Sequence, residues 1–417
     1  MIESPGYFKT EGEGELYVGK YKFLVSFQVF LINQDSVIYC KMDGSPVFAI
    51  DIDYSTKWSL KGTTIERNSF FATDLIITQL NGDFVELISN NNIIIGDYFD
   101  FAVDRVIYPL ANLFDLNFEA TVDDFRITVK SERNSIKKNI SKYWGIPQIS
   151  SELIVEKDNE PIDSFKEIAN YIIRLLSLGT GRHLVINIQT FFSKSKSFTL
   201  LQNAYVSPAY IGSLLLANDF PDLLIKGIPI LRSWNMEKFK DLRIILIYLN
   251  ATDKGYVDDR VLKLVQCYEI IAHKWVKSKY KLTSELTALK QRLKSAIKDW
   301  KKEYPKYDPN GFWSGRIHKS LEWEKTFKLL EDVLVSQNLD LKKLDVDFSK
   351  LVELRHEVAH SGRFGSVNAI KDLVNGQFAL RLYLLKILDF NGKIRDYRGT
   401  DWSKFKDISD FETMDSA

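Results

Sequence analysis

Cysteine and histidine are scarce in this sequence. Its 417 residues contain two cysteines, Cys40 and Cys267, and five histidines. Two distant cysteines exclude a disulfide framework, a cysteine-rich zinc module and an iron–sulfur site. A reducing compartment is the simplest setting for such a chain, so we expect a cytoplasmic protein.

Signals for export and for membrane insertion are also missing. The first residues carry acids and glycines, where a secretory signal needs a basic start followed by an apolar block. The longest stretch without charge, residues 197–218, contains polar residues and a proline and is too polar for a membrane span. We therefore expect no membrane partner.

The composition is that of a globular chain, with 45% hydrophobic and 27% charged residues. This length predicts two or three domains, each with its own core. The net charge of +1 hides an asymmetry, because residues 1–100 hold 14 acids and 7 bases. A polyanion is therefore expected to bind the later part of the chain.

Short runs of apolar residues with imperfect alternation dominate the first 130 residues and predict β-strands. The runs are residues 21–29, 36–41, 57–61, 75–80, 84–88 and 125–130. Asn81-Gly82 joins two of them, and this pair accepts the positive φ angles of a tight hairpin. A helix over residues 164–178 and one more strand over residues 183–189 are predicted to follow.

From about residue 235 the apolar residues recur at helical spacing, which predicts five helices. Their apolar positions fall in residues 261–275, 286–300, 323–334, 348–359 and 370–388. The predicted fold class is therefore α+β. An antiparallel β-rich domain covers residues 1–235, a helical bundle covers residues 236–395, and a polar C-terminal tail covers residues 396–417.

The fourth predicted helix combines a charge with an apolar face. The apolar residues of this face are Phe348, Leu351, Val352, Val358 and Ala359. At 100° per residue, Arg355 falls at the middle of the face. A guanidinium there needs an anion, a partner surface or a buried acid, because an unpaired buried charge costs several kcal/mol. An arginine at the edge of a bundle can instead reach solvent.

Two of the five histidines follow on the same helix. His356 and His360 are four residues apart and lie side by side at the flank of the apolar face. His360 is in the last turn before Gly362, where the helix dipole favours a protonated imidazole. This is suitable for a group that exchanges protons near neutral pH.

Arg-His-x-x-x-His followed by Ser-Gly, over residues 355–362, resembles the signature of the HEPN superfamily of helical-bundle ribonucleases. That signature is an arginine, four to six residues and a histidine, and its second position is usually asparagine, aspartate or histidine. The β-rich half ahead of a helical bundle also resembles the layout of ApeA-type antiphage proteins of bacteria.

The resemblance implies a metal-independent endoribonuclease without a cofactor. Two bundles would pair in a homodimer or higher oligomer and bring their motifs into one composite site. His360 would be the acid/base, Arg355 the cation that binds phosphate, and His356 an orienting or phosphate-binding group. The 2′-hydroxyl of RNA would be the nucleophile. The β-rich domain would be a sensor that releases the nuclease in response to an unknown phage trigger, and the damaged RNA would arrest growth in abortive infection.

Two other interpretations remain open. His356-Glu357-x-x-His360 also satisfies the zinc-protease pattern His-Glu-x-x-His, but its third ligand is missing. After Glu357 the next glutamate is Glu412, and Asp372 is the nearest substitute. We therefore expect no metal. The other interpretation is a catalytically silent module that dimerises or binds RNA.

A row of lysines on the second predicted helix is a candidate RNA-binding surface. It consists of Lys290, Lys294, Lys298 and Lys301. Residues 277–303 hold nine bases against three acids, which suits a phosphate backbone. The alternative is a solvated face of an amphipathic helix.

Overall fold

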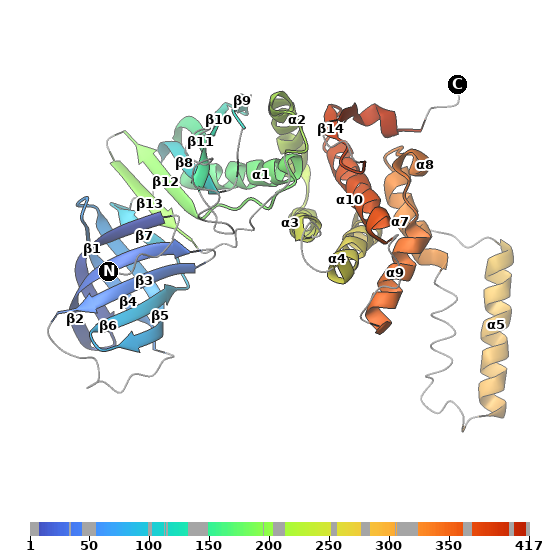
Figure 1. Ribbon diagram of the computed structural model, residues 1–417, viewed down its shortest axis with the longest axis horizontal. Coiled ribbons are helices and arrows are strands. Elements are labelled where there is room, and N and C mark those ends of the chain that lie inside the picture. Colours follow the sequence, from blue (N-terminus) through green and yellow to red (C-terminus); the bar gives the residue numbers. More distant parts are fainter. Residues whose placement is uncertain are drawn as a thin grey trace. The chain divides into compact units, whose positions relative to one another are not determined.

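The protein has two compact units, Met1–Arg232 and Ser233–Ala417, in a computed structural model (Figure 1). The structure describes residues 8–32, 35–43, 56–98, 102–111, 113, 116–131, 149–194, 196–202, 213–251, 257–276, 284–304, 306, 324–361, 369–399 and 404–413. The first unit is antiparallel and β-rich and the second is helical, so the predicted α+β fold class is confirmed.

Six strands of the first unit close into an antiparallel barrel. They are β1 (Phe8–Val18), β2 (Tyr21–Ile32), β3 (Asp35–Met42), β4 (Trp58–Thr64), β5 (Ser69–Asn81) and β6 (Phe84–Ser89). Their order is β4-β1-β2-β3-β6-β5, and β4 also pairs with β5, which closes the ring. Every second side chain of β2 from Val25 to Leu31 is buried in the barrel core.

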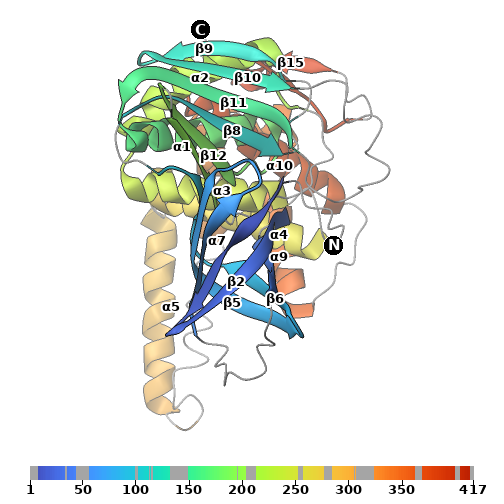
Figure 2. The ribbon, with the colours of Figure 1, turned by 90° about the vertical axis from the view of Figure 1, so that its left-hand side faces the viewer.

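The sheet continues from β5 through seven further strands. They are β7 (Ile93–Gly96), β8 (Val103–Ala111), β9 (Phe118–Val122), β10 (Phe125–Ser131), β11 (Ile149–Glu160), β12 (Ile188–Ser193) and β13 (Lys196–Leu201). Helix α1 (Ile162–Thr180) covers this part (Figure 2). Tyr108 on β8 donates a hydrogen bond to the Phe165 carbonyl at 3.0 Å, and the ring of Phe165 packs edge-on against Phe125. A 3-10 turn (Ala217–Asp219) and α2 (Phe220–Ser233) end the unit.

Local predictions in this unit are mostly confirmed. The hairpin forms with Gly82 at φ +62°, and α1 covers the predicted helix. The strand predicted over residues 183–189 is present but shifted along the chain: β12 begins at Ile188, where its pairing with β13 starts, and ends at Ser193.

The second unit consists mainly of helices. They are α3 (Met236–Ala251), α4 (Val257–Ile270), a π-helical turn η3 (Ile271–Val276), α5 (Ser284–Glu303), α7 (Glu324–Val335), α8 (Leu341–Leu344), α9 (Phe348–Ser361) and α10 (Ala369–Lys386). All five predicted helices are present, the first as α4 with η3. Helix α3 was not predicted. Helices α4, α7, α9 and α10 pack on one another. No helix in the described part of the chain is long and apolar enough to cross a membrane.

The segment expected as a polar tail is folded where the structure describes it. It follows β14 (Lys393–Arg395) and contains β15 (Phe405–Asp407) and a 3-10 turn (Ile408–Phe411). Ile408 and Phe411 are buried, and the Phe411 ring packs edge-on against Phe378 of α10. Part of this segment therefore belongs to the core of the second unit.

Candidate active site

Helix α9 carries the residues of the predicted nuclease motif and begins at a defined cap. Asp347 accepts hydrogen bonds from the backbone N–H of Ser349 at 3.0 Å and of Lys350 at 3.2 Å, as an N-cap residue does. Burial raises the pKa of Asp347, but these hydrogen bonds outweigh it and the pKa is lower than usual. The ionised carboxylate therefore stabilises the first turn of α9.

The buried side of α9 is formed by Phe348, Leu351, Leu354 and Val358. Val352, predicted in the apolar face, is only partly buried, and the side chain of Ala359 is outside the described set. Arg355 follows Leu354 at the border of the buried side, and 37% of its side chain is exposed. The arginine is thus half-buried, neither deep in the core nor fully in solvent.

Helices α4 and α10 hold α9 in place. The Tyr268 hydroxyl on α4 donates to the Gly376 carbonyl on α10 at 2.8 Å, and the Tyr268 ring packs edge-on against Phe348. A Cβ atom at Gly376 would lie 2.9 Å from Leu264 and 3.0 Å from Leu351. The lack of a side chain at Gly376 therefore lets the three helices approach closely.

Arg355 forms an ion pair across the α4–α9 contact. Its Nη1 donates to Oε1 of Glu269 at 2.6 Å, and 25% of the Glu269 side chain is exposed. A guanidinium has five N–H donors, so this bond leaves donors for another anion. The pair fixes the direction of the arginine and leaves part of it accessible to a phosphate.

The two histidines follow Arg355 on the same helix. His356 is exposed, and the backbone of His360 belongs to α9 one turn further on. The His360 side chain is outside the described residues. The five residue steps of helix from Arg355 to His360 correspond to a rise of about 7.5 Å.

The substitute metal ligand is placed at the other end of α9. Asp372 in the first turn of α10 is buried, which raises its pKa, and its charged neighbours include Asp347 and Lys350. His356 is six residues beyond Lys350, about 9 Å along the helix. Among the described residues, no three His, Cys, Asp or Glu side chains come together as a metal site.

The candidate RNA-binding lysines are all on α5. Lys294 and Lys298 are exposed, and Lys301 is partly exposed. Lys290 belongs to the helix, with its side chain outside the described residues. The described lysines thus present positive charge along α5.

Sequence reasoning missed Glu269. Glu269 follows Tyr268 at the flank of the apolar stripe of α4. An acidic residue at the flank of such a stripe is the one feature of the sequence that could have indicated a functional role. Its partner is 86 residues away, so only the packing of α4 against α9 identifies the pair. Comparisons with family models, with curated proteins and with solved structures found no match.

Proposed function

We propose that the second unit is a metal-independent endoribonuclease of the HEPN type that acts in bacterial antiphage defence. Two copies of the chain would pair and bring Arg355 and His360 of both into one site. The first unit would be the sensor that controls cleavage. The resemblance of residues 355–362 to the HEPN signature supports this proposal, and the proposed substrate of the enzyme is RNA.

The half-exposed Arg355 is the observation that carries the proposal. If an arginine only packs in the core, its side chain is not expected to be exposed. If an arginine only extends to solvent, it is not expected to have an ion-pair partner that orients it. Arg355 combines exposure with orientation by Glu269. A planar fork fixed in this way is suited to two oxygens of a phosphate.

The reaction follows from the residue types. A base, His360 of one copy, takes the proton from the 2′-hydroxyl, and O2′ attacks phosphorus. The P–O5′ bond breaks, and an acid, His360 of the other copy, protonates O5′. Arg355 stabilises the charge that develops on the phosphoryl oxygens. The products are a 2′,3′-cyclic phosphate and a 5′-hydroxyl, and DNA is resistant because it lacks the hydroxyl.

The test is cleavage of RNA by the purified full chain in EDTA, with analysis of the product ends. Arg355→Ala and His360→Ala should each reduce cleavage by at least about a hundredfold, the range of a lost acid/base or charge-stabilising group. Lys350→Ala, an exposed change on the same helix, is the matched control. Cleavage that persists in both variants would refute the proposal. So would stoichiometric zinc that is lost in His356→Ala, because it would favour the protease.

A catalytically silent module is the second candidate, and the ion pair itself favours it. Glu269 neutralises Arg355 within one chain, as expected if the arginine serves only to join α4 and α9. This candidate predicts that RNA is bound but intact under every activating condition tried. Unchanged RNA binding by Arg355→Ala would support the structural role.

A further inference from the structure

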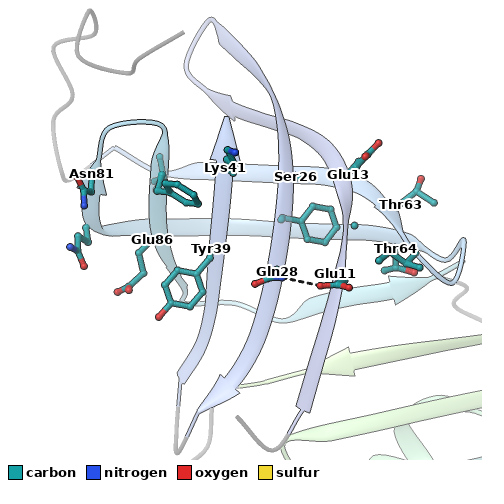
Figure 3. A pocket seen from close by; sticks show the side chains of 16 residues that line it. Glu11, Glu13, Ser26, Gln28, Tyr39, Lys41, Thr63, Thr64, Asn81 and Glu86 are labelled. Carbon is teal, nitrogen blue, oxygen red and sulfur yellow. Dashed lines mark hydrogen bonds between the residues drawn. The ribbon is translucent and has the colours of Figure 1, made fainter. Parts of the chain in front are cut away.

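The outer face of the barrel carries a groove of about 1090 Å³ (Figure 3). Its lining residues come from β4, β1, β2, β3, β6 and β5, which are adjacent in the sheet in this order. Most of its lining side chains alternate along each strand with residues of the barrel core, so they point away from the core. Phe27 and Val85 belong to the core and also line the groove.

The strand register arranges these side chains in two rows across the strands. The first row is formed by direct cross-strand neighbours, namely Glu11, Gln28, Tyr39, Glu86 and Gln79. Gln28 donates a hydrogen bond to Glu11 at 2.9 Å, which fixes one end of the row. Figure 3 shows Glu11, Gln28, Tyr39 and Glu86 along one line.

The second row is parallel to the first, two residues further along each strand. Its members, again direct neighbours, are Thr63, Glu13, Ser26, Lys41, Phe84 and Asn81. Phe84 is 49% exposed, and the Lys41 ammonium is 5.8 Å from its ring centre. The groove thus offers an aromatic surface beside polar side chains.

The dimensions suit a short extended chain. The first row crosses five adjacent strands, which at about 4.8 Å spacing give it a length of about 19 Å. An extended peptide rises about 3.3 Å per residue, so about six residues cover the groove. Amide and hydroxyl groups from both rows can bind its backbone.

The charges decide the class of occupant. The described lining contains three glutamates, Glu11, Glu13 and Glu86, against Lys41. These carboxylates repel the phosphates of RNA. A neutral oligosaccharide would remove these carboxylates from water without supplying a positive charge, and burying an unpaired charge is unfavourable. Lysine and arginine side chains of a peptide supply that charge, and Tyr39 and Phe84 can stack on guanidinium groups.

We propose that this groove binds an extended, lysine- or arginine-rich peptide segment of about six residues. The charged groups of the peptide's lysine or arginine side chains would pair with Glu13 and Glu86. The aliphatic parts of the same side chains would lie on the Phe84 ring. This site is separate from the RNA chemistry of the second unit and does not depend on it.

The probe is a fluorescein-labelled hexa-arginine peptide, titrated with the full chain and followed by fluorescence anisotropy. Glu13→Gln and Glu86→Gln should each weaken binding about two- to fivefold, as expected for exposed ion pairs, and their combination about tenfold. Lys41→Gln should strengthen binding about twofold, because it removes repulsion. Glu119→Gln, an exposed acid on β9, is the matched control and should leave binding unchanged.

Competing ligands are tested with the same variants. Chitohexaose represents a neutral saccharide, and labelled hexauridylate represents RNA. Circular dichroism verifies that each variant is folded. The inference is overturned if hexa-arginine does not bind, if it binds all variants equally, or if chitohexaose displaces it. Binding of hexauridylate that Lys41→Gln weakens would also overturn it, because the groove would then select an anion.

Discussion

Arg355 and Glu269 join α9 to α4 by a hydrogen-bonded ion pair in which both side chains are partly exposed. The candidate nuclease site therefore contains an acid next to its cation. This acid has two separable effects: it orients the guanidinium, and it competes with phosphate for it. Substitutions at Glu269 can distinguish these effects.

We expect Glu269→Gln to raise RNA affinity about two- to fivefold, because it removes a negative charge but keeps an oxygen that accepts from Arg355. Glu269→Ala should lower the cleavage rate about tenfold, because the guanidinium loses its orientation. RNA binding and cleavage assays measure the two effects. Glu353→Gln, an exposed change on α9, is the control. Equal effects of both Glu269 substitutions would show that the pair has no role in RNA chemistry.

Asp396 is expected to be the main pH-dependent contact of the C-terminal segment. It accepts from Arg398 Nε at 2.9 Å and Nη2 at 3.0 Å and from Lys406 at 2.8 Å. Burial raises the pKa of Asp396, but Arg398 and Lys406 hold it far below the usual value. Asp396→Asn should therefore destabilise the second unit by about 3 kcal/mol at pH 7.

The sign of the pH dependence follows from the lowered pKa. The stabilisation by Asp396 is complete above its unfolded pKa of about 3.9 and is lost as the pH falls towards the folded value. Urea unfolding should show a constant difference between the wild type and Asp396→Asn above pH 5, and a smaller difference below pH 4. A difference that grows at low pH would contradict the assignment.

The parts of the fold that follow local rules could be predicted from the sequence. On α4, Val261, Leu264 and Tyr268 recur at helical spacing, and all three are buried. The predicted hairpin turn forms with a positive φ at Gly82, whereas Asn81 is the last residue of β5 and does not have a positive φ. Such features depend only on residues that are close in the sequence. They can therefore be predicted from the spacing of apolar residues and from the residue types at the turn.

Features that depend on distant pairing could not be predicted. The apolar run at residues 183–189 suggested a strand, yet β12 is shifted because its partners β8 and β13 set the register. Glu269 gains its role only through α9. The two rows of the groove exist because β1, β2, β3, β6 and β5 align in one register, which no single strand encodes.

Glycine at position 14 is predicted to be required for the barrel. Gly14 pairs with Gly62 across β1 and β4, and a Cβ atom there would lie 2.2 Å from the Lys61 carbonyl oxygen. Backbone atoms cannot move aside as a side chain can, so Gly14→Ala should cost about 2–3 kcal/mol. Hydrogen exchange of the β1 amides measures this loss. Gly399→Ala, where a Cβ atom meets nothing within 4 Å, is the control, and similar exchange in both variants would contradict the steric argument.

The lysines of α5 are predicted to contribute to RNA affinity through counterion release. Each phosphate contact adds about 0.7–0.9 to the slope of log K against log salt, so Lys294→Ala and Lys298→Ala should each lower the slope by about that amount. Affinity should fall similarly for every RNA sequence, because phosphates carry no sequence information. Lys342→Ala on α8, also exposed, is the matched control. If the slope stays the same in both α5 variants, this row is only a solvated helix face, and RNA must bind elsewhere.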